Sequence, residues 1–245
     1  METESSVIAL RSVGKRFGRR YVLREIDADI NAGEMTLLLG NNGAGKSTLL
    51  KLLSTLMRPS LGTLYFRGQP YQRSAEAVRA AVGMISHESR FYQDLSAREN
   101  LRVYGTLYGV RDLAPRIATA LDATNLAAVI DVPVRAFSSG MIKRLALARL
   151  QLYAPQVLLL DEPYSGLDQV SIAMMDRFLG DFKARGGTTV LVTHQFTNGV
   201  QLCDRILIVD QGRVVYHGQE HRPDAARCVE LLQTHTAGPQ RAAGA

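Results

Sequence analysis

The chain of 245 residues contains only two cysteines, Cys203 and Cys228, and neither has a second cysteine or a histidine in metal-ligand spacing. A disulfide framework and a zinc site are therefore disfavoured, and a reducing compartment is expected. No apolar run approaches the ~18 residues that span a bilayer. The opening residues, Met-Glu-Thr-Glu, do not resemble a signal peptide. We expect a protein that stays inside the cell and meets a membrane only as a peripheral subunit.

Long runs of one charge are also missing, although the overall balance is basic. The formal net charge is +6 and the sequence pI is near 9.5, yet no five basic residues occur in a row. Such a balance favours polyanions such as nucleotides, an anionic membrane surface or nucleic acid. The scattered positions instead favour an ordinary solvated surface. No internal repeat or coiled-coil heptad occurs, and the length indicates one large domain or two small ones.

One glycine-rich segment has the spacing of a phosphate-binding P-loop, two glycines separated by four residues and followed by Lys-Ser. An apolar run over residues 35–39 precedes it, and leucines at helical spacing follow it. The alternative, a turn without a ligand, fits this strand–loop–helix context less well. The predicted phosphate-binding residues are Gly40, Asn41, Asn42, Gly43, Ala44, Gly45, Lys46, Ser47 and Thr48.

The residue types of the P-loop can each be explained by the chemistry of phosphate binding. The glycines let the backbone curl so that its N–H groups point inward, and the helix N-terminus adds partial positive charge. Lys46 is predicted to reach the β- and γ-phosphates, which makes it a candidate catalytic residue. The Ser47 hydroxyl is predicted to bind Mg²⁺. The expected ligand is therefore a nucleotide with Mg²⁺.

The remaining patterns predict an α/β fold with a largely parallel central sheet, because near-continuous apolar runs alternate with helices. A capping box at Ser96 and Glu99 opens a helical insert over about residues 90–152, with further helices at about 113–123 and after residue 140. The predicted domain covers residues 5–234, with a disordered tail over 235–245. The strands are expected near residues 7–13, 21–30, 64–66, 82–86, 157–160, 188–194, 206–210 and 213–216, the last two as a hairpin.

An acidic pair, Asp161-Glu162, directly follows the apolar run 157–160. A carboxylate at the end of a buried parallel strand lies at the edge of the sheet where ligands bind. Asp161 is predicted to hold Mg²⁺, and Glu162 to polarise the attacking water, because in-line attack on phosphorus needs a base. The alternative is a strand that ends in solvated acids.

The order of these motifs resembles the ATP-binding cassette of ABC transporters over about residues 7–232, with an antiparallel β subdomain beside the helical one. Residues 137–141, Phe-Ser-Ser-Gly-Met, are similar to the family's Leu-Ser-Gly-Gly-Gln signature, and residues 164–168 resemble its D-loop. The resemblance implies that His194 contacts the γ-phosphate. It also implies that Phe17 stacks on adenine, although a lone Phe before a glycine is by default a core or loop aromatic. The predicted nucleotide-binding residues of the signature are Ser138, Ser139 and Gly140.

Two departures from the family pattern stand out. The family's Mg²⁺-contacting glutamine aligns with His87, whose imidazole is a poor direct Mg²⁺ ligand and titrates near neutral pH. In the signature, Ser139 replaces a glycine and Met141 replaces glutamine. Ser138 and Gly140 keep the hydroxyl and the backbone that face phosphate in the family, so an active site is still expected.

The resemblance also implies an assembly. Two chains would pair head to tail, so that each ATP lies between the P-loop and acidic pair of one chain and the signature of the other. Hydrolysis would move membrane-spanning permease subunits docked beside the helical insert, which places the chain at the cytoplasmic face of the inner membrane. No nucleic acid is expected as a partner.

The transported molecule is the least constrained point. Residues 86–87, 137–144 and 161–168 are similar to the ATPase subunit of the haem exporter of cytochrome c maturation. Another small-molecule or lipid exporter is the alternative. A soluble ABC protein acting on nucleic acid or ribosomes is disfavoured because tandem cassettes and long coiled-coil insertions are missing. A metabolic kinase is disfavoured by the signature and the D-loop.

Overall fold

The computed structural model describes residues 6–86 and 90–236, so His87 lies outside the described residues. A six-stranded sheet with the order β10-β9-β3-β8-β7-β6 forms the centre. Its neighbouring strands pair in parallel except β10, which pairs antiparallel with β9 as the predicted hairpin. The bounds are β3 Met35–Leu39, β6 Val82–Ile85, β7 Val157–Asp161, β8 Thr188–Val192, β9 Arg205–Asp210 and β10 Arg213–Gln219. The predicted α/β class with a largely parallel sheet is confirmed.

The inner strands are buried on both faces, which explains their continuous apolar sequence. Alternate side chains of β3 point into different cores, because successive strand residues face opposite sides of a sheet. Leu37 and Leu39 belong to the core under the helical subdomain, whereas Leu38 belongs to the core shared with the antiparallel strands. The sheet therefore forms the middle layer of the molecule.

A second, antiparallel sheet has the order β2-β1-β4-β5. Its two long strands extend beyond the predicted ranges, since both continue to the ends of the turn at residues 18–19. The predicted antiparallel β subdomain is thus present. The bounds are β1 Ser6–Phe17, β2 Arg20–Asn31, β4 Leu61–Phe66 and β5 Gln69–Pro70.

Seven α-helices occur in the described part of the chain, and the helical insert contains three of them, α3 to α5. The capping box that opens α3 is present, since Ser96 and Glu99 exchange both of their side-chain-to-backbone hydrogen bonds. The last helix, α7, was not predicted, and it includes residues 235 and 236 of the predicted tail. The bounds are α1 Lys46–Leu53, α2 Tyr71–Ala81, α3 Ala97–Leu107, α4 Leu113–Ala123, α5 Ser139–Tyr153, α6 Gln169–Ala184 and α7 Ala225–Thr236, with short 3-10 helices Ala127–Val129, Val134–Ala136 and Val200–Leu202.

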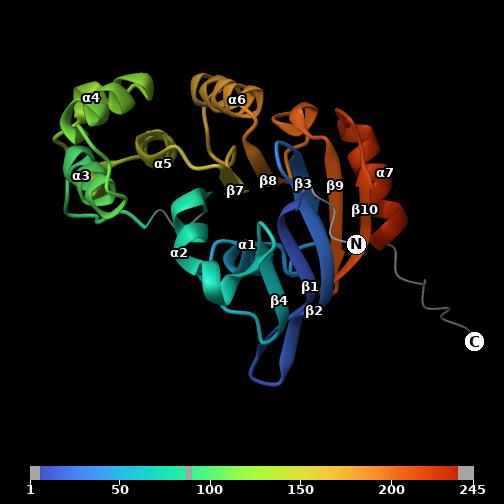
Figure 1. Ribbon diagram of the computed structural model, residues 1–245. Helices are drawn as coiled ribbons and strands as arrows, with labels where there is room; N and C mark the ends of the chain where they lie inside the picture. Colours follow the sequence, from blue (N-terminus) through green and yellow to red (C-terminus); the bar gives the residue numbers. More distant parts are fainter. Residues whose placement is uncertain (1–5, 87–89, 237–245) are drawn as a thin grey trace, which may run out of the picture.

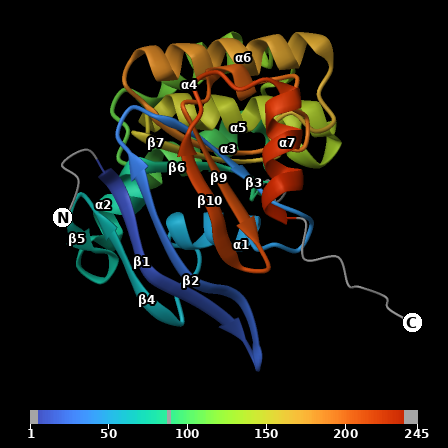
Figure 2. The ribbon, with the colours of Figure 1, turned by 90° about the vertical axis from the view of Figure 1, so that its right-hand side faces the viewer.

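The elements form distinct regions in space. Helices α3, α4 and α5 lie together at one side of the central strands, and α7 lies at the other side (Figure 1). The antiparallel strands β1, β2 and β4 lie at the end of the molecule away from α6 (Figures 1 and 2). Among the described residues, no helix has the length and apolarity that a bilayer crossing requires.

Candidate functional site

Three adjacent strands bring the predicted nucleotide-binding segments together. β3, β8 and β7 are neighbours in the central sheet and run parallel, so their carboxyl ends share one edge. The P-loop follows β3, Asp161 ends β7, and His194 follows β8 by two residues. The edge of a parallel sheet at the strands' carboxyl ends is the usual ligand position in such folds.

The first P-loop glycine is required by its surroundings. Gly40 has φ +149°, and a Cβ atom there would lie 2.1 Å from the carbonyl oxygen of Val209 on β9. Any side chain would push the loop off the sheet. Gly40 therefore sets how deeply the loop is seated.

Helix α1 begins at Lys46, directly after Gly45, which has φ +111°. No described side chain caps this N-terminus, so its first backbone N–H groups have no side-chain acceptor. Uncapped N–H groups together with the helix dipole attract an anion. The local structure has the backbone geometry of a phosphate cradle, and phosphate binding at these residues stays a prediction.

Lys46 is held over the loop. Its side chain is 8% exposed, and its Nζ donates hydrogen bonds to the carbonyl oxygens of Gly40 at 2.7 Å and Asn41 at 3.1 Å. Burial lowers the pKa of Lys46, an effect partly opposed by the negative charges of Glu162 and Asp161. A bound anion would provide further opposite charge for this buried ammonium.

These residues line one cavity of about 500 Å³. The predicted members of its wall are Asn42, Gly43, Gly45, Lys46, Ser47, Thr48, Asp161, Glu162 and His194. Arg20 and Val22 of β2 also line it and were not predicted. Gly40, Asn41 and Ala44 were also predicted, but they are not among the residues that line this cavity.

The carboxylate of Glu162 faces His194. Its Oε1 is buried without a hydrogen-bond partner and lies 3.6 Å from Nε2 of His194. Its Oε2 accepts a hydrogen bond from the backbone N–H of His194 at 3.3 Å. An unsatisfied buried carboxylate oxygen is costly unless a ligand or water provides a donor. This geometry suits a carboxylate that accepts a proton from water.

The donor set beside Lys46 fits Mg²⁺. The Ser47 hydroxyl and the Asp161 carboxylate line the same cavity, and Asp161 is only 7% exposed. Mg²⁺ prefers such oxygen ligands and takes its remaining ligands from phosphate and water. Mg²⁺ therefore does not need a site in which every ligand comes from the protein. Among the described residues, no group of three or more His, Cys, Asp or Glu side chains could hold a metal ion.

Phe17 lies at the end of β1, where it pairs across the turn with Arg20. Its side chain is 47% exposed, and the Lys15 ammonium lies 5.3 Å from the ring centroid. Phe17 is thus not a core residue, and its neighbour Arg20 lines the cavity. The ring is exposed, as stacking on a base requires, although Phe17 itself does not line the cavity.

The signature residues lie outside this cavity. Ser138 caps α5 by accepting a hydrogen bond from the backbone N–H of Met141 at 3.2 Å. Ser138 and Ser139 are exposed, and Gly140 is half-buried. A helix N-terminus with an exposed serine is a second candidate anion site. Within one chain the structure does not bring this site to the P-loop.

The β9–β10 turn supports the P-loop from below. The backbone N–H of Gly212 donates to the carbonyl oxygen of Ala44 at 3.2 Å, and the carbonyl oxygen of Gly212 accepts from the Arg24 backbone N–H at 2.7 Å. A Cβ at Gly212 would lie 2.3 Å from the carbonyl oxygen of Val22. The turn therefore packs closely between β2 and the loop.

Comparison with known proteins agrees with this geometry. The chain is 37% identical over 216 residues to Nod factor export ATP-binding protein I of Sinorhizobium fredii (strain NBRC 101917 / NGR234), covering 87% of the chain and 63% of the relative. It is 38% identical over 216 residues to daunorubicin resistance ATP-binding protein DrrA3 of Streptomyces coeruleorubidus, covering 87% of the chain and 68% of the relative. The chain thus spans about two thirds of the length of these curated relatives.

A solved structure described as the ATP-binding subunit of an ABC transporter superposes with a TM-score of 0.84 at 26% identity, covering 93% of this chain and 100% of that one. The ABC transporter family profile matches residues 23–165, which include the P-loop, the signature and the acidic pair. The chain therefore belongs to the family of ABC transporter ATP-binding domains.

Proposed function

We propose that this chain binds and hydrolyses ATP and thereby drives export through separate membrane subunits. The observation that carries the proposal is the convergence of Lys46, Asp161, Glu162 and His194 on one cavity at the carboxyl edge of the sheet. Lys46 and the α1 N-terminus bind the phosphates, and Glu162 takes a proton from the attacking water. Mg²⁺ bound by Ser47 and Asp161 would neutralise charge on the phosphates.

A second copy of the chain completes the site. The signature at the start of α5 lies outside the P-loop cavity, yet it carries the features of an anion site. Head-to-tail pairing would place Ser138 and Gly140 of one protomer against the ATP held by the other. The exposed position of Ser138 supports this arrangement.

Two measurements test the ATPase part. Wild-type protein should hydrolyse ATP with Mg²⁺, and Lys46→Ala should lose ATP binding measured by titration calorimetry. Retained micromolar affinity in Lys46→Ala would remove the P-loop from its proposed role. Phosphoryl transfer to a small molecule with little ATP hydrolysis would indicate a metabolic kinase instead.

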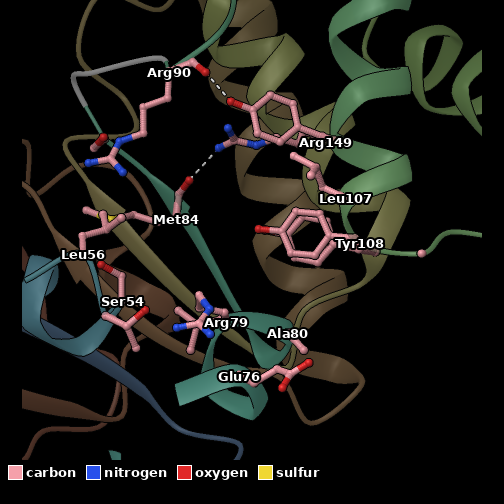
Figure 3. Close-up of a pocket in the computed structure, with 16 residues that line it drawn as sticks. Ser54, Leu56, Glu76, Arg79, Ala80, Met84, Arg90, Leu107, Tyr108 and Arg149 are labelled. Carbon is pink, nitrogen blue, oxygen red and sulfur yellow. Dashed lines mark hydrogen bonds between the residues drawn. The ribbon is translucent and has the colours of Figure 1, made fainter. Parts of the chain in front are cut away.

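A groove beside the helical subdomain is the proposed docking site for the membrane subunits. It has a volume of about 730 Å³ and lies between the end of α1, α2, β6, α3 and α5 (Figure 3). Leu107 is 73% exposed and Leu56 is 45% exposed on its walls. Large exposed apolar side chains around a groove are typical of a protein contact. Peripheral attachment at the cytoplasmic face of the inner membrane follows from this docking.

Purification from membranes tests the partner and the location. Tagged chain should co-purify with membrane-spanning subunits, and Leu107→Glu should reduce their recovery while ATPase activity of the isolated chain is kept. Undiminished recovery from Leu107→Glu would exclude this wall of the groove. Salt-dependent binding of duplex DNA or ribosomal RNA at physiological ionic strength would favour a soluble ABC protein acting on nucleic acid.

The proposed cargo is a small exported molecule. The two curated relatives are named for Nod factor export and daunorubicin resistance, which supports export as the direction. Haem for cytochrome c maturation is the second candidate, favoured by the short similar strings around residues 86–87, 137–144 and 161–168. Loss of c-type cytochromes on deletion of the gene would support haem, and intact c-type cytochromes would exclude it.

A further inference from the structure

Lys143 on the signature helix contacts the backbone next to the proposed general base. Its Nζ donates a hydrogen bond to the carbonyl oxygen of Glu162 at 2.9 Å and a second, short one to the carbonyl oxygen of Ser165. Lys143 lies on α5, one turn after the Ser138 cap. This side chain therefore connects the helical subdomain with the segment that follows β7.

The Glu162 backbone is in an unusual conformation. Its φ is +53°, in the left-handed region that costs a non-glycine residue about 1 kcal/mol or more. Its N–H donates to the carbonyl oxygen of Val192 at 2.9 Å, and the Lys143 ammonium binds its own carbonyl oxygen. The two peptide groups that flank the Glu162 Cα are thus each held, the preceding one by β8 and the following one by Lys143 of α5.

The Lys143 ammonium donates its hydrogen bonds to backbone carbonyl oxygens. Among the described residues, no carboxylate lies within ion-pair distance of its ammonium. Burial lowers the pKa of Lys143, and the negative charge of Glu162 opposes this shift. A half-buried ammonium held only by carbonyls favours one fixed peptide orientation, because charged hydrogen bonds are stronger than neutral ones.

The adjoining loop packs on the same signature. A Cβ at Gly166, which has φ +71°, would lie 3.4 Å from Oγ of Ser139, and a Cβ at Gly140 would lie 4.0 Å from Cδ2 of Leu167. Displacement of the start of α5 would therefore also displace residues 165–167. Lys143 adds a polar contact between α5 and this loop, because its ammonium donates to the carbonyl oxygen of Glu162.

We propose that Lys143 is a positioning residue that holds the Glu162 peptide, so that the carboxylate is aimed at its water only when the signature helix is seated. The inference rests on the proposed ATPase function, with Glu162 as base. It makes hydrolysis, rather than ATP binding, depend on the position of the helical subdomain.

The test uses the full chain with the variants Lys143→Met, Lys143→Arg and Lys143→Gln. Lys143→Met should lower kcat roughly tenfold to a hundredfold, the usual effect of losing a charged hydrogen bond. Affinity for a non-hydrolysable ATP analogue should stay within about twofold, because Lys143 does not line the nucleotide cavity. Lys143→Arg should restore most of kcat. The control Arg177→Met removes an exposed cation of α6 and should leave both values unchanged.

A double-mutant comparison separates positioning from general loss of structure. If Lys143 acts through the carboxylate, Lys143→Met should have little further effect on kcat in a Glu162→Gln background. Equal losses of kcat in both backgrounds, or a parallel loss of analogue affinity, would overturn the proposal. If Lys143→Met does not fold, Lys143→Gln, which keeps a donor without charge, is read by the same criteria.

The two proposals fail in different ways. A wild-type chain without ATPase activity would overturn the proposed function, and a Glu162→Gln variant with unchanged kcat would remove Glu162 as the base on which this inference rests. Normal kcat in Lys143→Met, together with slow turnover in Glu162→Gln, would overturn only the role of Lys143.

Discussion

At the scale of single residues, the nucleotide site combines groups with clear local patterns and groups without any. The P-loop and the acidic pair were predictable because spacing and a preceding apolar strand determine their position. Arg20 and Val22 were not predictable, because they reach the cavity only through packing of β2 beside the loop. Their alternating strand sequence is the same as that of any surface strand.

Glu162→Gln is expected to keep ATP binding and slow turnover by ~10²–10⁴, the usual contribution of a general base. The amide preserves the shape of the side chain beside His194 but no longer accepts a proton. Steady-state phosphate release and analogue titration measure the two effects. Unchanged turnover would assign the base to another group.

Gly40→Ala is expected to destabilise the fold more than Gly68→Ala. Both glycines have positive φ, but a Cβ at Gly40 would collide with the carbonyl oxygen of Val209, whereas one at Gly68 meets nothing within 4 Å. The left-handed strain alone costs about 1 kcal/mol, and the collision should add about 2 kcal/mol or more. Urea denaturation measures both variants, and equal losses would show that the collision relaxes freely.

At the scale of elements, the buried parallel strands were the most predictable part of the fold. Residues 157–160 and 188–192 are continuous apolar or β-branched runs, and both form central strands. Helix α7 was missed because it buries little, with Cys228 and Leu231 as its buried residues. The turn-side end of β1 was also missed, because Lys15 and Arg16 interrupt the apolar pattern although residues 15–17 still pair with β2.

Strand β10 carries a histidine that should make stability depend on pH. Burial, and then the charge of Arg205, lower the pKa of His217 below 6.5, while Asp29 and Glu34 oppose the shift. Its Nε2 is buried without a hydrogen-bond partner. As pH falls through 6.5, the unfolded chain takes up this proton before the folded one, so stability decreases.

His217→Gln should therefore lose less stability than the wild type between neutral pH and pH 5, measured by urea denaturation at each pH. Substitution of the exposed His221 by Gln is the matched control and should follow the wild-type curve. Identical pH dependence of wild type and His217→Gln would contradict the burial argument.

At the scale of the whole molecule, pairing of two copies remains a prediction, as does the division into one cassette over residues 5–234. The sequence carries the pairing only through the family resemblance of the signature. No local sequence pattern of this chain indicates which surface would contact a second copy. The separation of the signature from the P-loop cavity is the feature that gives the prediction its physical basis.

Gly140→Asp should abolish pairing driven by ATP while leaving nucleotide binding at the P-loop within about twofold. A Cβ at Gly140 makes only ordinary contacts, at 3.9 Å and beyond, so the fold accommodates the side chain. The added carboxylate would repel the triphosphate held by the other protomer. Light scattering in a Glu162→Gln background with ATP measures the association, and Gly140→Ala is the neutral control. Persistent dimers of Gly140→Asp would place the signature outside the interface.

The β9–β10 turn has a consequence for how the molecule is made. The loop at residues 40–48 leaves the ribosome before Val209 and Gly212, which lie against Gly40 and Ala44 of the loop. Contacts between distant parts of a chain form only after both parts are available. A nascent chain that stops before this hairpin would contain the complete phosphate-binding motif, but not the β9–β10 residues that pack against it.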